Sequence, residues 1–193
     1  MTLLIQVAVY LFKAYAMVVL LRFFMQYFRV DFYNPFSQTI VQLTNPPLKP
    51  LRRLIPGFRG LDIASLLLAF VLSLLMLCLV YGSLVAQNSS YLLPLSAIAV
   101  LEFAYLIFDL FWYLIVARII VSFIMMAAGN NQGNPFAAIL FQLTRPIMQP
   151  FQRVIPPVGM FDFSPIIIFL LIGIIQYGLQ ILALEILPVA RLF

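Results

Sequence analysis

Four long hydrophobic stretches, separated by polar segments, form the dominant pattern of this chain. Their approximate bounds are 3–28, 63–86, 94–128 and 163–187. Each is long enough to supply the roughly 20 apolar residues that a membrane-spanning helix needs. The polar segments at 29–62 and 129–162 are long, whereas the turn at 87–90 is short. The pattern predicts an all-α membrane protein with four transmembrane helices.

The two long polar segments match each other at an offset of 100 residues. Each starts with Asn-Pro-Phe, at Asn34 or Asn134, continues with Gln-Leu-Thr and ends on Asp62 or Asp162. The other matches are Pro46 with Pro146, Pro50 with Pro150, Arg53 with Arg153, and Ile55-Pro56 with Ile155-Pro156. We therefore predict two tandem repeats, 1–90 and 91–193, each with two transmembrane helices and a proline-rich loop.

Basic residues predict the orientation of the chain. Five Lys or Arg side chains lie in segment 29–62 and two in 129–162, but the turn at 87–90 has none. The positive-inside rule places both long loops in the cytoplasm. With two helices per unit, both units insert in the same direction, so we expect parallel repeats around an axis along the membrane normal.

Local signals within the loops predict short helices. Asn34-Pro35 and Asn134-Pro135 are typical of a helix N-cap followed by proline at the first helical position. The apolar residues that follow Asn34 have helical spacing, which favours an amphipathic helix in the membrane interface. We expect the prolines from Pro46 and Pro146 onward to end these helices, because proline lacks an N–H donor.

The matched acidic residues directly precede the second span of each unit. We expect Asp62 and Asp162 to cap these spans. A salt bridge to Arg53 or Arg153 is the alternative role.

Charged residues inside the spans match at a different offset. Arg22 aligns with Arg118 at an offset of 96, because the second copy has four extra residues before its Asn-Pro pair. Lys13 then aligns with Asp109, and an axis between the units would make these positions face each other. We predict a Lys13–Asp109 ion pair. In the alternative, Lys13 snorkels and Asp109 is protonated or bonded to Tyr113.

Three further charged side chains have open roles. Arg22 and Arg118 lie roughly two helical turns from the predicted cytoplasmic ends. They could snorkel to phosphates, or bind the carbonyls or the Asp of the following loop. Glu102 shares a helix face with Asp109, and the two could line a wet crevice. They lie about 10 Å apart along the axis, which is too far for a shared proton.

Composition narrows the class of protein. The chain is 65% hydrophobic and 9% charged, against roughly 25% charged in soluble domains. The net charge of +5 lies mostly in the loops and points to anionic lipid headgroups as partners, whereas no base-reading motif suggests nucleic acid. With no His and one Cys, we expect no disulfide, metal or cofactor.

The doubled motif resembles the YggT family of bacterial and plastid membrane proteins over essentially the whole chain. Segments 22–27 and 31–38 are similar to gammaproteobacterial members. The second copy departs from the first at Arg145, which replaces Asn45, and at Gln152, which replaces Arg52, so its loop is less basic.

The resemblance implies a bacterial inner-membrane protein associated with osmotic stress tolerance, through potassium or other solute handling. Some bacterial relatives lie near cell-division genes, and plastid relatives are associated with cytochrome b6 maturation and nucleoid distribution. The resemblance provides no catalytic residues.

Two functional hypotheses follow. The first is a non-enzymatic scaffold or assembly factor, whose loops contact lipid headgroups and another membrane protein or a second copy of the chain. The second is a component of an ion or small-solute channel or transporter, suggested by Lys13, Glu102 and Asp109 inside the membrane. An enzyme is disfavoured because no nucleophile–base pair or metal cluster can be recognised.

Overall fold

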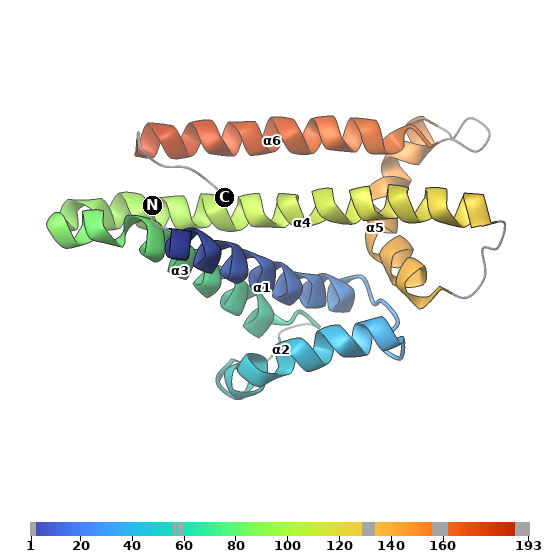
Figure 1. The fold of residues 1–193 in the computed structure, drawn as a ribbon, viewed down its shortest axis with the longest axis horizontal. Helices are drawn as coiled ribbons and strands as arrows, with labels where there is room; N and C mark the ends of the chain where they lie inside the picture. The colour runs from blue at the N-terminus through green and yellow to red at the C-terminus, as the bar shows by residue number, and fades with distance from the viewer. Residues whose placement is uncertain (1–2, 56, 58–59, 129–133, 156–161, 188–193) are drawn as a thin grey trace.

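The structure, a computed structural model, describes residues 3–55, 57, 60–128, 134–155 and 162–187. Its secondary structure over these ranges is helical (Figure 1). The elements are α1 (Leu3–Tyr27), α2 (Pro35–Leu54), α3 (Ile63–Gln87), the short 3-10 helix η1 (Ser89–Tyr91), α4 (Leu92–Ala128), α5 (Pro135–Val154) and α6 (Ser164–Ile186).

Four helices, α1, α3, α4 and α6, are long and apolar enough to cross a membrane, which confirms the four predicted spans. The longest is α4, with 37 residues. At 1.5 Å per residue it measures roughly 55 Å, whereas the hydrocarbon core of a bilayer is about 30 Å thick. Part of α4 therefore extends beyond the apolar layer.

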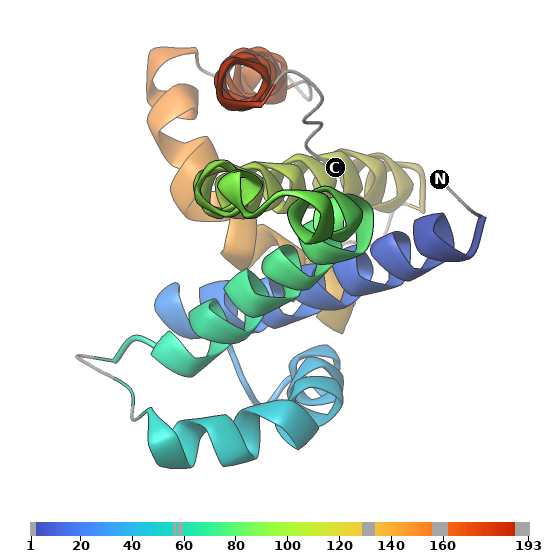
Figure 2. The same ribbon diagram turned by 90° about the vertical axis from the view of Figure 1, so that its left-hand side faces the viewer.

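Helices α1 and α3 pack closely together, and α4 and α6 lie beside this pair. In Figures 1 and 2, α4 lies between α6 on one side and the α1–α3 pair on the other. Helix α3 packs on α1 and has a stripe of fully buried small side chains, Ser65, Ala69 and Ser73, of which Ala69 shares a core cluster with Ala16 and Leu20 of α1. Small residues let two helix backbones approach closely, which is how helices associate where water provides no hydrophobic driving force.

A defined turn ends α1 and leads the chain towards α2. Arg29 adopts a left-handed conformation with φ of 54°. Its N–H donates to Gln26 O at 3.2 Å, and the N–H of Val30 donates to Met25 O at 2.9 Å. These two bonds form a Schellman motif, which satisfies carbonyls that the helix end leaves free. The turn positions α2 beside α1 and α3.

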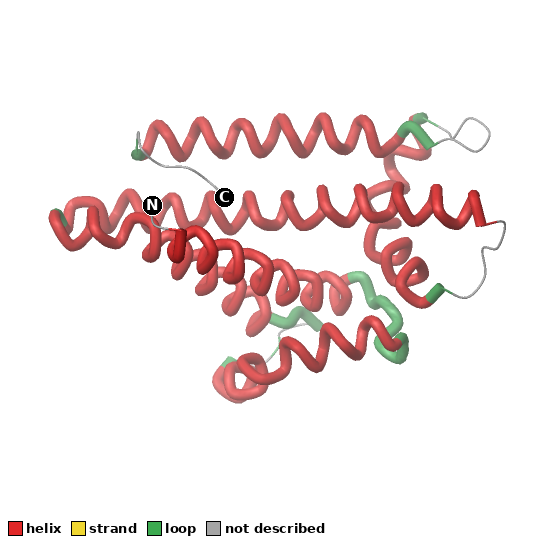
Figure 3. Tube along the Cα trace, viewed as in Figure 1, coloured by secondary structure: helices red, strands yellow, loops and turns green. Residues whose placement is uncertain are grey.

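The prediction that prolines end the loop helices was wrong. Both α2 and α5 continue to residues 54 and 154, with Pro46, Pro47 and Pro50 inside α2 and Pro146 and Pro150 inside α5 (Figure 3). Each proline removes one helical hydrogen bond, and both helices are bent (Figure 2). Packing of α2 on α1 and α3, and of α5 on α4 and α6, holds them together despite these losses.

Candidate functional site

The helices α2 and α5 begin in the same way. The side chain of Asn34 accepts a hydrogen bond from the N–H of Phe36 at 2.9 Å, and that of Asn134 accepts one from Phe136 at 3.0 Å. Each helix has proline at its first position, where no intrahelical donor is needed. The two asparagines thus act as the N-caps that the sequence predicts.

The two capped ends also touch each other, and we call this junction the α2–α5 contact. Asn34 Nδ2 donates to Pro135 O at 2.9 Å, and the N–H of Asp31 donates to Gln142 Oε1 at 3.1 Å. The rings of Phe36 and Phe136 meet edge to face with centroids 5.0 Å apart. Segments about 100 residues apart in sequence are therefore joined through both polar and aromatic groups.

Between the spans, Lys13 Nζ of α1 lies 2.6 Å from Asp109 Oδ2 of α4, in an ion pair. The two side chains are only 16% and 14% exposed. The ion pair predicted from the offset of 96 is present, and it replaces the alternative of a snorkelling lysine. Each charge is neutralised inside the protein, so neither has to face lipid alone.

Glu102, one of the residues that suggested a wet crevice, has no exposed surface. It lies fully inside the protein, on the same helix as Asp109. An open crevice lined by Glu102 is thus excluded. The structure instead makes Glu102 an interior carboxyl group.

Arg22 is buried and binds the helix that follows its own span. Its Nη1 donates to Thr44 Oγ1 at 2.6 Å, to Asn45 Oδ1 at 2.9 Å and to Val41 O at 3.1 Å. The hydroxyl of Thr44 donates in turn to Ile40 O at 2.7 Å, which leaves its lone pairs for the guanidinium. Snorkelling to phosphates was therefore the wrong expectation for Arg22, and binding to the following loop was the right one.

Arg118 makes the matching contact with fewer partners. Its Nη1 donates to Thr144 Oγ1 at 2.7 Å, and Thr144 donates to Leu140 O at 2.7 Å. The guanidinium carbon lies 4.8 Å from the centre of the Phe141 ring, in a cation–π contact. Position 145 is itself an exposed arginine, so it does not supply the acceptor that Asn45 offers to Arg22. Arg118 thus keeps more unused donor capacity than Arg22 within the described residues.

A contact that sequence reasoning missed repairs one of the proline gaps in α2. Pro47 has no N–H for the carbonyl of Leu43, four residues earlier. The hydroxyl of Tyr15 donates to Leu43 O instead, at 3.2 Å. The second copy has Phe111 at the matching position of its span and Ile147 in place of Pro47. There the backbone N–H is available, and no hydroxyl is required.

Asp62 both caps α3 and binds an arginine. Its Oδ1 accepts from the N–H of Ser65 at 3.4 Å, and its carboxylate also accepts from the Ser65 hydroxyl. The ion-pair partner is Arg52, which lies on the carboxylate through both Nε and Nη2, and the alternative partner Arg53 is exposed. Successive helical residues point about 100° apart, so only one of the two arginines can face Asp62.

Asp162 binds differently because two neighbouring residues differ. Position 165 is proline and has no N–H, so Asp162 Oδ1 accepts from Ser164 at 2.9 Å, one residue earlier than in the first copy. Phe163 occupies the N-cap position of α6, so the expected capping by Asp162 was wrong by one residue. Its Oδ2 accepts from Gln152 Nε2 at 2.7 Å, and Arg153, the expected salt-bridge partner, is exposed.

Both carboxyl groups have a lowered pKa. Burial by itself raises the pKa of Asp62, but hydrogen bonds from Arg52 and Ser65 and the charge of Arg52 outweigh it. Burial likewise raises the pKa of Asp162, and hydrogen bonds from Gln152 and Ser164, with the charge of Arg118, reverse the direction. Asp62 is thus held by a local arginine, whereas the charge that acts on Asp162 comes from Arg118 on α4.

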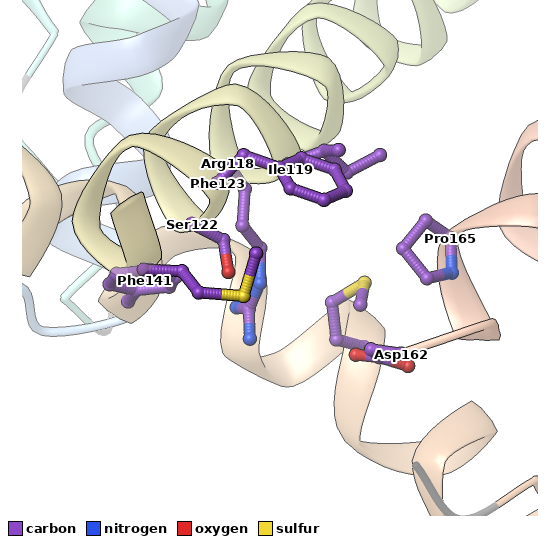
Figure 4. A pocket seen from close by; sticks show the side chains of 9 residues that line it. Arg118, Ile119, Ser122, Phe123, Phe141, Asp162 and Pro165 are labelled. Atoms are coloured by element: carbon purple, nitrogen blue, oxygen red, sulfur yellow. The ribbon is translucent and has the colours of Figure 1, made fainter. Parts of the chain in front are cut away.

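A cavity of about 130 Å³ separates Arg118 from Asp162. Figure 4 shows Arg118 pointing from α4 into this space, with Asp162 and Pro165 on the opposite side. Its remaining lining is Ile119, Ser122, Phe123, Met126, Phe141 and Met148. The two charged groups form no direct ion pair, and no cluster of potential metal ligands occurs in the described part of the chain. The arrangement suits binding more than catalysis.

Known proteins similar to this chain share nearly its full length. A protein from Vibrio alginolyticus is 39% identical over 166 residues, 83% of this chain and 84% of the relative. YggT of Escherichia coli K12 is 37% identical over 170 residues, 86% of this chain and 83% of the relative. A Pseudomonas aeruginosa protein is 36% identical over 162 residues, which cover 84% of this chain and 80% of the relative. All three are named as uncharacterized or only by gene position.

The comparison with solved structures finds no match. The sequence model of one family, described as CCB3/YggT, matches residues 1–82 and again residues 97–183. These two segments contain the Asn-Pro helices, most of the spans before and after them, and both arginine–threonine contacts. The chain is therefore a member of the CCB3/YggT family.

Proposed function

We propose that this chain is a non-enzymatic scaffold or assembly factor of the bacterial inner membrane. The observation that carries the proposal is the α2–α5 contact, which joins the two loop helices into one surface next to the spans. The intramembrane charges support it, because Lys13, Arg22 and Asp109 are engaged in internal contacts. A link to osmotic stress tolerance rests on the family resemblance alone.

The scaffold consists of two repeats, 1–90 and 91–193, related by an axis along the membrane normal. Two pairs of matched positions support this axis because each pair meets: Lys13 with Asp109, and Phe36 with Phe136. The paired contacts of Arg22 with Thr44 and of Arg118 with Thr144 support it too. So does the double match of the family model.

The joined loop surface faces the cytoplasm and anionic headgroups in this proposal. Exposed basic side chains on both loop helices support the assignment: Lys49, Arg53, Arg145 and Arg153. Basic residues beside a membrane are attracted to anionic lipids by about 1 kcal/mol each. The surface formed by α2 and α5 is then free to hold a partner membrane protein or a second copy of the chain.

Affinity purification in a mild detergent tests the scaffold role. The wild-type chain is expected to recover a stoichiometric partner or a defined oligomer. Asn34→Ala should lower recovery more than the matched control Asn134→Ala, because Asn34 provides both a cap and the bond to Pro135 O, whereas the contacts of Asn134 with other described residues are those of a cap. A monomer without any partner, or equal effects of the two variants, would contradict the proposal.

The channel alternative receives less support. A permeation path needs charged groups that face water, whereas Lys13 is neutralised by Asp109 and Glu102 is fully buried. Ion flux into reconstituted liposomes discriminates the two functions. Flux that exceeds protein-free liposomes and changes in Asp109→Asn would favour a channel, and flux equal to that of protein-free liposomes would exclude it.

A further inference from the structure

The two arginine sites differ in how their charges are balanced. In the first, Arg22 has three acceptors and Asp62 is paired with Arg52. In the second, Arg118 has one hydrogen-bond partner within the described chain, Thr144. The carboxylate of Asp162 has only the neutral donors Gln152 and Ser164 there.

The second site therefore contains a cation and an anion that face a common cavity without touching (Figure 4). A guanidinium offers several N–H groups in a planar fork that suits phosphate oxygens. A carboxylate with neutral donors at its oxygens still attracts an ammonium group. In the first site the guanidinium of Arg52 occupies the place beside the carboxylate that a bound ammonium would take in the second.

The depth of the cavity indicates where such a ligand comes from. Asp162 directly precedes α6, so it marks the loop end of that span. Arg118 lies on α4 roughly 15 Å before its end at Ala128. Because α4 is longer than the apolar layer, this position corresponds to the boundary where headgroups lie. Phe123, Met126 and Met148 add apolar walls suited to glycerol and acyl carbons.

We propose that this cavity binds the headgroup of a zwitterionic phospholipid, with the phosphate on Arg118 and the primary ammonium of phosphatidylethanolamine on Asp162. The site is specific for this headgroup, in contrast to the general attraction of the loops for anionic lipid. It does not depend on the scaffold role, since a channel could hold the same lipid. Lipid binding tests this site and partner recovery tests the scaffold role, so either proposal can fail while the other stands.

Native mass spectrometry of the purified chain with defined lipids tests the assignment. Phosphatidylethanolamine should bind more tightly than phosphatidylglycerol, which lacks an ammonium, and than phosphatidylcholine, whose methylated ammonium donates no N–H bond. Gln152→Arg, which recreates the first site's arginine, should lower the preference for phosphatidylethanolamine by about tenfold, the equivalent of one charge-assisted hydrogen bond. Asp162→Asn should do the same, and the matched control Asp62→Asn should leave the preference unchanged.

Arg118→Gln should weaken binding of all three lipids. If the Arg118→Gln variant does not fold, the Gln152→Arg variant still tests the proposal. Tighter binding of phosphatidylglycerol to the wild type, or an unchanged preference in Gln152→Arg and Asp162→Asn, would overturn the proposal. Displacement of the lipid by an equal concentration of soluble phosphoethanolamine would overturn the lipid as ligand and indicate a free phosphate ester. Failure of soluble phosphoethanolamine to compete supports the membrane source.

Discussion

Single residues in this protein show how charges are accommodated within apolar spans. Lys13, Asp109 and Arg22 each meet a specific partner, at distances of 2.6 Å for the ion pair and for the Arg22–Thr44 bond. A buried ion pair adds little net stability compared with apolar residues of similar size, because both ions lose their hydration. Removal of one partner is much more harmful, since it leaves an isolated charge.

The first prediction follows from this asymmetry. Lys13→Leu and Asp109→Leu should each lower the free energy of unfolding by about 3 kcal/mol, because the remaining charge loses its partner. The double variant should recover most of that loss. Unfolding in mixed detergent micelles measures all three, and Lys49→Leu, at an exposed loop position, is the control. Additive losses in the double variant would show that the two side chains do not stabilise each other.

The second prediction concerns pH at the carboxylates that precede α3 and α6. The pKa of Asp62 and that of Asp162 are lower in the folded chain than the ordinary value near 3.9. Such groups stabilise the fold above about pH 4, and this contribution is lost as the pH falls through the folded-state pKa. Asp62→Asn keeps a side chain that can cap α3 but removes the charge.

Unfolding in micelles should therefore show a larger destabilisation of the Asp62→Asn variant at pH 7 than at pH 3. The difference between wild type and variant should narrow at pH 3, because the carboxyl group of the unfolded chain binds a proton below its ordinary pKa near 3.9. An equal difference at both pH values would mean that the charge of Asp62 does not stabilise the fold.

At the scale of elements, the loop helices persist because neighbouring helices supply what proline removes. In α2 three prolines would break an isolated helix, yet the helix continues to Leu54. Tyr15 of α1 provides the donor that Leu43 O lacks because of Pro47, and Arg22 of α1 ties α2 to the span through Thr44 and Asn45. The stability of α2 is thus a property of its contact with α1 more than of its own sequence.

The third prediction tests this repair. Tyr15→Phe should lower the free energy of unfolding by about 1 kcal/mol, because Leu43 O loses its donor. In a Pro47→Ala background the same change should have little effect, since the alanine introduced there donates from its own N–H. A double-mutant cycle over the four chains, measured by unfolding in micelles, gives the coupling. A coupling of zero would mean that the Tyr15 hydroxyl does not compensate for Pro47.

At the scale of the whole molecule, the two loop helices touch each other where they begin, through Asn34 with Pro135 and Phe36 with Phe136. Two segments in contact through Asn34 and Pro135 cannot lie on opposite faces of a bilayer. We therefore expect both loops to lie on the same side of the membrane. Their basic residues predict that this side is the cytoplasm.

The fourth prediction is a test of this topology. Leu54 and Val154 are each 80% exposed, which makes them matched sites for a single cysteine in a Cys78→Ser background. A membrane-impermeant maleimide should label both from the cytoplasmic face, in inside-out vesicles. A cysteine at the exposed Ser90 should react only in right-side-out vesicles. Labelling of positions 54 and 154 from opposite faces would contradict the arrangement.

Hydrophobic length and residue matching were enough to predict much of this protein. The four spans follow from long apolar stretches, because a bilayer requires continuous apolar length whatever the packing. The Lys13–Asp109 pair was predicted from the offset of 96, and the two side chains do meet. The Asn-Pro starts of α2 and α5 follow from local backbone chemistry.

Tertiary structure alone decided the rest, because those features depend on which groups meet across helices. The continuation of α2 past Pro47 depends on a hydroxyl from another helix. The choice of Arg52 over Arg53 depends on which side of α2 faces Asp62. The cavity between Arg118 and Asp162 exists because α4, α5 and α6 hold two charges near each other without contact. Local sequence patterns carry no information on such distances.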